Sequence, residues 1–246
     1  MISLRQRLTQ IGAPTGGGVS VLRALFGFVF ERVPADPDPT VATSVSLRDK
    51  LVRIAGRYVN LNVIAVGWDT FSADERRAVD YAILRAHGIL GAGGLGLGRI
   101  GRYAINAADA RGRDDLGSED EAEDLTQEWS VPNNGLDVFV VANISDTDYI
   151  GLSPVPGPCD KDAKGMNGLI GGEVNLGHVQ LARTFSHEIC HYLGLSHNHG
   201  DACPTSAADR NNLMAQSRCA TNVRTSTVLT GAQQSTIRGH CAVQNR

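Results

Sequence analysis

The sequence lacks a marked excess of charge of either sign. Its 246 residues contain 23 lysines and arginines against 26 aspartates and glutamates, so the formal net charge is −3 and the sequence pI is about 6.1. Proteins that bind nucleic acids or anionic membranes through their charge usually carry a basic patch. The balanced charge therefore argues against both kinds of partner.

The sequence also lacks an apolar run that could cross a membrane. The longest run, Val19 to Phe30, is interrupted by Arg23, whereas a membrane-spanning helix needs about 20 apolar residues. With Arg5 and Arg7 before it and Val33-Pro34-Ala35 after it, the run could be a poor signal peptide. We favour the alternative, which is a buried helix or a pro-segment.

No cysteine precedes residue 159, and all five lie between Cys159 and Cys241. This number indicates at least one disulfide and an oxidising compartment, so we expect a secreted or extracytoplasmic protein. Cys203 and Cys219 are a possible disulfide. At most two of Cys159, Cys190 and Cys241 can then form another.

The composition divides the chain into an extension, residues 1–44, and one domain, residues 45–246. The extension contains the flexible segment Thr15-Gly16-Gly17-Gly18 and the stiff, proline-rich segment Pro34–Pro39. It is expected to be a pro-segment, a signal or a linker. The domain should start with a short helix at Leu47–Ala55.

The first half of the domain predicts a strand, a helix and a second strand. Tyr58–Val66 is rich in β-branched residues, Ser72–Glu75 is a capping box that opens a helix, and Arg99–Ala107 again suits a strand. Such a unit forms a right-handed crossover onto a parallel sheet. Gly88–Gly101 should be a flexible loop, because a dinucleotide-binding fingerprint would need a strand before it and a helix after it.

A strongly charged segment follows at Arg111–Glu128. We interpret it as a solvated helix that is capped by Ser118 and has acidic residues in its first turn. A Ca²⁺ site is the alternative, although the spacing matches no ordered calcium loop. Its ligands would come from Asp114, Asp115, Glu119 or Asp120.

The rest of the sequence predicts three further strands and two helices. Leu136–Ala142 suits a central strand, Ile150–Pro158 an edge strand because of its three prolines, and Leu169–Val174 a last strand. A helix should span His178–Leu193. Thr230 opens a C-terminal helix that continues to about Ala242.

The expected helix at His178–Leu193 and the residues just after it contain the pattern H-E-x-x-H-x-x-G-x-x-H. The pattern is formed by His187, Glu188, His191, Gly194 and His197. Residues four apart share one face of a helix, so His187 and His191 can bind the same metal ion. Gly194 can adopt the left-handed conformation that ends a helix, which allows the chain to return His197 as a third ligand. Glu188 can reach a metal-bound water.

Three neutral imidazoles with one open position describe a catalytic Zn²⁺ site. Zinc lowers the pKa of its bound water from 15.7 to about 7, and a neighbouring carboxylate can accept the proton. A purely structural zinc site is disfavoured because such sites usually have four protein ligands. His199 and Asp201 are further possible ligands, but His197 has the expected spacing.

The motif resembles that of the metzincin clan of zinc metallopeptidases. Asn211–Ala215, with Met214, occupies the place of the clan's methionine turn. His191–Leu195 resembles the pappalysin helix end, and Gly151–Val155 resembles the substrate-edge segment of reprolysin-type enzymes; we do not choose between them. Gln216 stands where some subfamilies have a tyrosine ligand, so that catalytic assistant is absent.

The resemblance implies an α/β (α+β) fold with a mostly parallel, five-stranded twisted sheet and one antiparallel edge strand. The upper subdomain would be residues 45–194. The lower one, residues 195–246, would be small and irregular and end in a helix. The edge strand, with Gly151, Leu152 and Ser153, would bind a protein or peptide substrate as an extended strand.

The expected function is that of a monomeric, zinc-dependent endopeptidase in which Glu188 activates the water. The alternative is a catalytically inert, zinc-bearing recognition module on the same scaffold. Inert relatives would be expected to lose the glutamate or a histidine, and this chain keeps all four. Because no cysteine precedes residue 159, latency through a thiolate of the extension is excluded.

Overall fold

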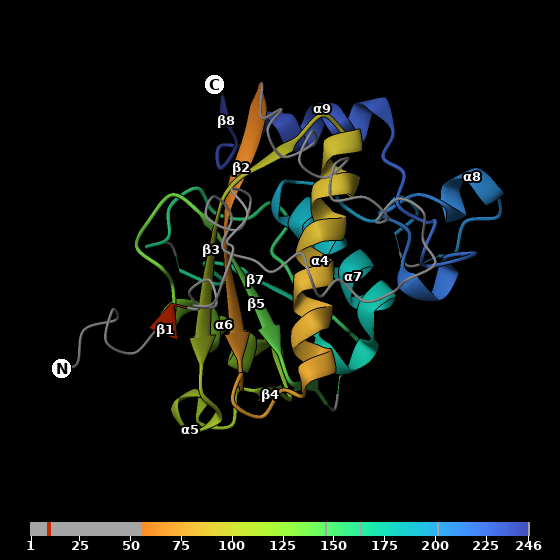
Figure 1. The fold of residues 1–246 in the computed structure, drawn as a ribbon. Coiled ribbons are helices and arrows are strands. Elements are labelled where there is room, and N and C mark those ends of the chain that lie inside the picture. The colour runs from red at the N-terminus through yellow and green to blue at the C-terminus, as the bar shows by residue number, and fades with distance from the viewer. Residues whose placement is uncertain (1–8, 11–55, 146, 163, 201, 246) are drawn as a thin grey trace, which may run out of the picture.

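The structure is a computed structural model that describes residues 9–10, 56–145, 147–162, 164–200 and 202–245 (Figure 1). The expected helix at Leu47–Ala55 and almost all of the expected extension, residues 1–44, lie outside the described residues. Within that extension, Thr9–Gln10 forms strand β1, which pairs antiparallel with Ala104 and Tyr103.

The sheet is mostly parallel, as predicted. Its strands are β2 (Arg57–Val66), β3 (Gly96–Ile105), β5 (Leu136–Val141) and β7 (Leu169–Glu173), in the order β3-β2-β5-β7, and each neighbouring pair is parallel. β1 extends the β3 edge, and β8 (Gln244–Asn245) pairs antiparallel with the start of β2. A separate two-stranded sheet contains β4 (Asp115–Leu116) and β6 (Asn143–Ile144).

Helices cover both faces of this sheet (Figure 1). α4 (Ala73–Ala92) and α7 (His178–Tyr192) share one hydrophobic core with the β2 side chains Leu61 and Val63. α6 (Glu119–Glu128) shares a second core with β2 and β5 through Leu125, Trp129 and Phe139. Two successive residues of a strand face opposite sides, so β2 contributes to both cores.

The remaining elements are short. They are the helices α5 (Ala107–Ala110), α8 (Ala207–Arg210) and α9 (Gly231–Gly239), and the 3-10 turns η3 (Val174–Leu176) and η4 (Ser217–Cys219). Capping follows the sequence: Ser72 and Glu75 form the expected capping box of α4, Thr230 and Gln233 that of α9, and Ser118 caps α6.

The glycine-rich segment is not the expected loop. α4 continues through Gly88 to Ala92, and β3 already begins at Gly96, so only Gly93–Leu95 connect them. The glycines of β3 have a steric reason, because a β-carbon at Gly98 would lie 2.4 Å from Oδ1 of Asn60. Close approach of a neighbouring strand therefore explains glycine there better than flexibility does.

Two other expectations need correction. Ile150–Pro158 forms no extended edge strand, because only Leu152 pairs, in a single antiparallel bridge with Ile170 of β7. The prolines of this segment have no N–H to donate to a neighbouring strand. The C-terminal helix ends at Gly239 rather than Ala242, and the chain then returns to the sheet as β8 instead of ending in a helix.

The ligands of the alternative calcium site do not gather. Asp114, Asp115, Glu119 and Asp120 belong to no group of three or more close metal-ligating side chains in the described part of the chain. α6 is also only partly solvated, because Ala122, Leu125 and Thr126 are buried. Among the described residues, no helix combines the length and apolar character needed to cross a membrane.

Candidate metal centre

The motif begins on the buried part of helix α7, in which every residue from Leu181 to Tyr192 is buried. The left-handed conformation of Gly194 (φ 100°) ends the helix, as the sequence predicted. The amide of Leu195 then donates to the carbonyl of Cys190 at 3.0 Å, which turns the chain back toward the helix. This reversal places His197 beside His187 and His191.

The three histidines point their Nε2 atoms at one place. Nε2 of His197 lies 3.2 Å from Nε2 of His187 and 3.2 Å from Nε2 of His191. Four tetrahedral ligands at 2.0–2.1 Å from one zinc ion would lie about 3.3 Å apart. The spacing of these nitrogens is therefore that of ligands around a single ion.

The other ring nitrogens fix the tautomers of two of these histidines. Nδ1 of His187 lies 2.7 Å from the carbonyl oxygen of Leu213, and Nδ1 of His191 contacts the carbonyl oxygen of Leu195. A carbonyl only accepts, so each Nδ1 carries the proton and each Nε2 offers its lone pair. A proton on His197 Nε2 could satisfy only one of the two lone pairs, whereas a cation satisfies both.

Burial keeps the imidazoles of His187 and His191 neutral. It lowers the pKa of His187 well below its usual value and lowers that of His191 to about 4. Metal ligation needs the neutral imidazole. The donor set and its protonation state thus suit Zn²⁺, which binds three nitrogen ligands and a water in catalytic sites.

Glu188 lies next to this cluster, on the wall of a cavity of about 820 Å³. Burial raises the pKa of its carboxyl to about 8, against the opposing charge of Arg183. The cavity is lined by the three histidines, by the segment Asp148–Ser153 with Val155, and by residues after the methionine turn. The buried histidine cluster therefore faces a space that can admit a chain segment.

Residues 87–198 match the family model described as metallo-peptidase family M12B, reprolysin-like. The matched segment covers slightly less than half of the chain and contains Gly151 and the whole motif through His197. The predicted resemblance to metzincin-type zinc metallopeptidases is confirmed. The match ends before Met214, so it does not bear on the methionine turn.

Two solved structures are similar to this chain. Archaemetzincin from Methanopyrus kandleri has a TM-score of 0.46 and 15% sequence identity, over 72% of this chain and 93% of that one. Metalloproteinase-II from Bacteroides fragilis has a TM-score of 0.47 and 12% identity, over 79% of this chain and 60% of that one. The search of curated proteins found no match.

The expected methionine turn contacts the histidine cluster through its backbone, because the Leu213 carbonyl accepts from Nδ1 of His187. Met214 and Leu213 are fully buried. The carbonyl of Met214 accepts from the amide of Asn198, just after the third histidine, at 3.1 Å, and Asn212 Oδ1 accepts from the Met214 amide at 2.8 Å. Gln216 lines the cavity, and its side-chain amide nitrogen donates to the Gly200 carbonyl at 3.3 Å.

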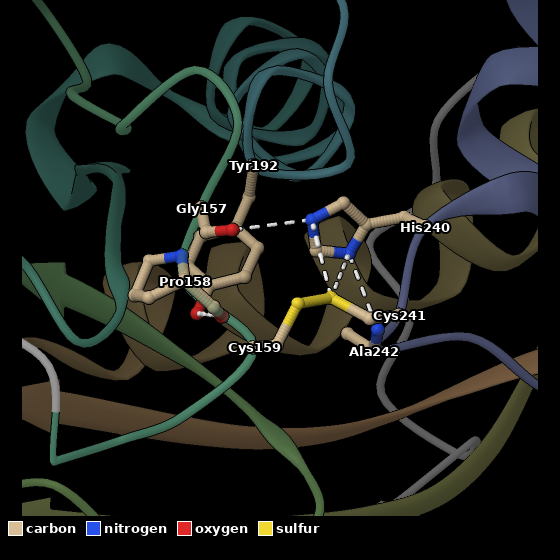
Figure 2. The surroundings of a disulfide bond; sticks show 7 residues. All are labelled: Gly157, Pro158, Cys159, Tyr192, His240, Cys241 and Ala242. Carbon is tan, nitrogen blue, oxygen red and sulfur yellow. Dashed lines mark hydrogen bonds between the residues drawn. A yellow bond between two sulfur atoms is a disulfide. The ribbon is translucent and has the colours of Figure 1, made fainter.

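A second group of contacts holds the segment Gly157–Cys159, which follows the cavity residue Val155 (Figure 2). The hydroxyl of Tyr192 donates to the Pro158 carbonyl, and the Tyr192 carbonyl accepts from the Gly157 amide, both at 2.8 Å. His240 Nε2 lies 3.1 Å from the Gly157 carbonyl. A disulfide between Cys159 and Cys241 covers this arrangement. Tyr192, the residue after His191, thus holds this segment against the end of α7.

The cysteines divide into two disulfides and one thiol. Cys203 and Cys219 form the disulfide that the sequence suggested, 16 residues apart around the methionine turn. Cys190 is a buried free thiol whose pKa is raised by burial and by Glu188. It therefore lies on the buried side of α7, in the first hydrophobic core, and is not bridged to Cys241.

The structure brings together the residues of the motif but not all the candidates. His199 is 42% exposed and pairs with Asp209 at 3.4 Å instead of facing the other histidines, and Asp201 lies outside the described residues. Sequence reasoning missed Arg183, Tyr192 and His240. Arg183 offered one signal, since it occupies the same helical face as His187, four residues earlier.

Proposed function

We propose that this protein is a zinc-dependent endopeptidase that hydrolyses peptide bonds in proteins. His187, His191 and His197 are the zinc ligands, and Glu188 is the general base and then the general acid. The observation that carries this proposal is the convergence of three Nε2 lone pairs beside the buried carboxyl group of Glu188, in a cavity of about 820 Å³.

Zinc, when bound, lowers the pKa of its water and polarises the scissile carbonyl. The charge of Arg183 and that of a bound Zn²⁺ would both favour the ionised form of Glu188 over the neutral form that burial favours. In its ionised form Glu188 accepts the proton of the attacking water, and it later donates a proton to the leaving amine. Its place next to His187 on α7 keeps it beside the ligands without competing for the metal. Gln216 offers no phenol, so Glu188 is the only acid–base group of the motif.

The substrate is proposed to bind along Gly151–Ser153. Both the amide and the carbonyl of Leu152 bond to Ile170 of β7, at 3.0 and 2.8 Å. The bridge to β7 involves Leu152 alone, so the backbone groups of Gly151 and Ser153 take no part in it. An extended peptide can pair with them as an added strand. Residues 45–246 would form the catalytic unit.

The test replaces Glu188 with glutamine, which keeps the shape and removes the base. We expect Glu188→Gln to retain its zinc and its melting temperature and to lose about 100-fold or more of its activity on a proteome-derived peptide library. Glu173→Gln is the matched control, because Glu173 is also buried but does not line the cavity. It should cleave like the unmodified protein.

The second candidate is an inert, zinc-bearing recognition module on the same scaffold. If the unmodified protein and Glu188→Gln both bind zinc and neither cleaves any library peptide, the module is the better description. Cleavage at internal positions of the peptides would identify an endopeptidase. The two disulfides support a secreted or extracytoplasmic location.

A further inference from the structure

Arg183 is a buried cation on the metal-binding helix. Its side chain is 1% exposed, and it lies four residues before His187. Arginine is rarely buried unless its donors are satisfied. No carboxylate forms an ion pair with it among the described residues, so its bonding partners have to be sought elsewhere.

Those partners belong to the chain that passes under the metal site. The guanidinium donates to the carbonyl oxygens of Leu213 at 3.1 Å, Ala215 at 2.5 Å and Ser226 at 3.1 Å. It also donates to Oγ of Ser217 at 2.9 Å. Arg183 thus joins α7 to both sides of the methionine turn and to the cavity wall.

One of these acceptors is shared with a metal-binding residue. The carbonyl oxygen of Leu213 accepts from Arg183 and also from Nδ1 of His187, at 2.7 Å. The two donors come from neighbouring positions on one face of α7 and converge on a single oxygen. The position of that oxygen fixes the rotation of the His187 ring, and hence the direction of its Nε2 lone pair.

We propose that Arg183 is a positioning residue of the metal site, which orients His187 through the Leu213 carbonyl and holds the cavity wall through Ser217. This inference rests on the proposed function, because it takes the His187 cluster as the zinc site. It assigns Arg183 no contact with the metal or the substrate.

Geometry explains why arginine suits this role. The planar guanidinium presents five donors in a fixed fork, whereas a lysine ammonium is a compact point charge on a flexible stem. Burial lowers the pKa of Arg183 only to about 10, so it stays charged at neutral pH. A lysine could keep the charge but could not reach acceptors on Leu213, Ala215, Ser217 and Ser226 together.

The test compares Arg183→Lys with Arg102→Lys. Arg102 is also buried, with 6% exposed area, and its partner is a single carboxylate, Asp80, on α4 away from the metal site. Apo proteins would be titrated with Zn²⁺ and Co²⁺ against a chromogenic chelator, and the visible absorption of the Co²⁺ forms recorded. Melting temperatures of the apo forms report the structural cost of each change.

We expect Arg183→Lys to raise the dissociation constants for both metals about tenfold or more and to alter the Co²⁺ absorption bands. Arg102→Lys should keep the dissociation constants within about twofold and the bands unchanged, even where its apo form melts as low. Equal metal affinities and spectra for Arg183→Lys and the unmodified protein would overturn the proposal, as would equal weakening in both variants.

Ser217→Ala separates the two parts of the role. It removes the wall contact but leaves the Leu213 carbonyl with both donors, so it should raise KM and leave metal affinity unchanged. A loss of metal affinity in Ser217→Ala as large as that in Arg183→Lys would contradict positioning through Leu213. Failure of the unmodified protein to bind zinc would instead refute the proposed function, so the two failures are distinguishable.

Discussion

Gly151 lies directly against the side chain of Glu188. A β-carbon at residue 151 would lie 2.9 Å from Cγ of Glu188 and 2.7 Å from Cγ2 of Thr184. Both neighbours stand on α7, whose Glu188 is buried and has little room to move. The wall segment can therefore approach the proposed base this closely only because residue 151 has no side chain.

This contact makes Gly151→Ala a specific test of whether activity depends on the close approach of the Gly151–Ser153 segment to Glu188. The added methyl group should displace Glu188 or the wall by a fraction of an ångström, and kcat/KM on a library-derived peptide should fall about 10- to 100-fold. Zinc content should not change. Gly88→Ala is the control, because a β-carbon there meets nothing within 4 Å; it should leave kcat/KM intact. Equal activities in the two variants would contradict the prediction.

The assignment of His197 as the third zinc ligand can be tested by comparing two variants, His197→Ala and His199→Ala. His197→Ala should lose stoichiometric zinc, because its Nε2 is the one that lies 3.2 Å from both other nitrogens. His199→Ala should keep it, because His199 pairs with Asp209 on the surface. Metal analysis after dialysis decides between them. Retention of one zinc by His197→Ala would refute this ligand set.

Metal removal should lower the stability of the fold. A ligand that binds only the folded state at 1,000 times its dissociation constant stabilises it by about 4 kcal/mol. Dialysis against a chelator should therefore lower the melting temperature by several degrees, and added zinc should restore it. Scanning calorimetry of both forms measures the effect. Identical melting of the two forms would contradict zinc binding at the buried cluster.

Lys161→Met is expected to make the free energy of unfolding depend more strongly on pH than it does in the unmodified protein. Burial raises the pKa of Asp137, and Lys161, whose Nζ lies 2.6 Å from Oδ1, opposes this. Without Lys161, the folded-state pKa rises further above the unfolded value. Between these two values the folded state binds more protons, so stability should increase as the pH falls through this window.

At neutral pH the same variant should lose about 2 kcal/mol of stability, less than for a fully buried pair because Lys161 is 22% exposed. Lys164→Met, at an exposed lysine nearby, is the control and should follow the unmodified protein. Urea unfolding at several pH values measures both variants. A pH profile of Lys161→Met parallel to that of the control would refute the prediction.

The Cys203–Cys219 disulfide should stabilise the methionine turn. It closes a loop with a sequence separation of 16 around Met214, and loops of that size correspond to about 3 kcal/mol in the chain-entropy model. The double change Cys203→Ala and Cys219→Ala should lower the free energy of unfolding by 2–4 kcal/mol, roughly. It should also weaken zinc binding, because the turn supplies the Leu213 carbonyl. Unchanged zinc affinity would show that the turn holds its place without the disulfide.

The sequence predicted the elements whose signals are local. The capping box at Ser72 and the β-branched run before Val66 depend on neighbouring residues, and the structure has both. The prediction of a flexible loop at Gly88–Gly101 was wrong, because the glycines of β3 are required by close contacts with the adjacent strand. One such contact is that of Gly98 with Asn60. Such contacts join residues far apart in the chain and leave no local pattern.

The residues of the candidate site also divide into those with a local sequence signal and those placed by distant contacts. The spacing of the motif is enough to bring His187, His191 and His197 together, because a helix and one left-handed glycine define their geometry. Arg183 could not be assigned from spacing, since its acceptors lie 30 to 43 residues further along the chain. Tyr192 and His240 meet only through the folded C-terminal segment.

The Cys159–Cys241 disulfide joins residues 82 positions apart and spans the part of the chain with the motif and the methionine turn (Figure 2). A single cut in any loop between these cysteines would leave both fragments covalently connected. Self-cleavage there would therefore escape notice on a non-reducing gel and appear as two bands only after reduction. Preparations of the protein should be compared under both conditions before their activity is interpreted.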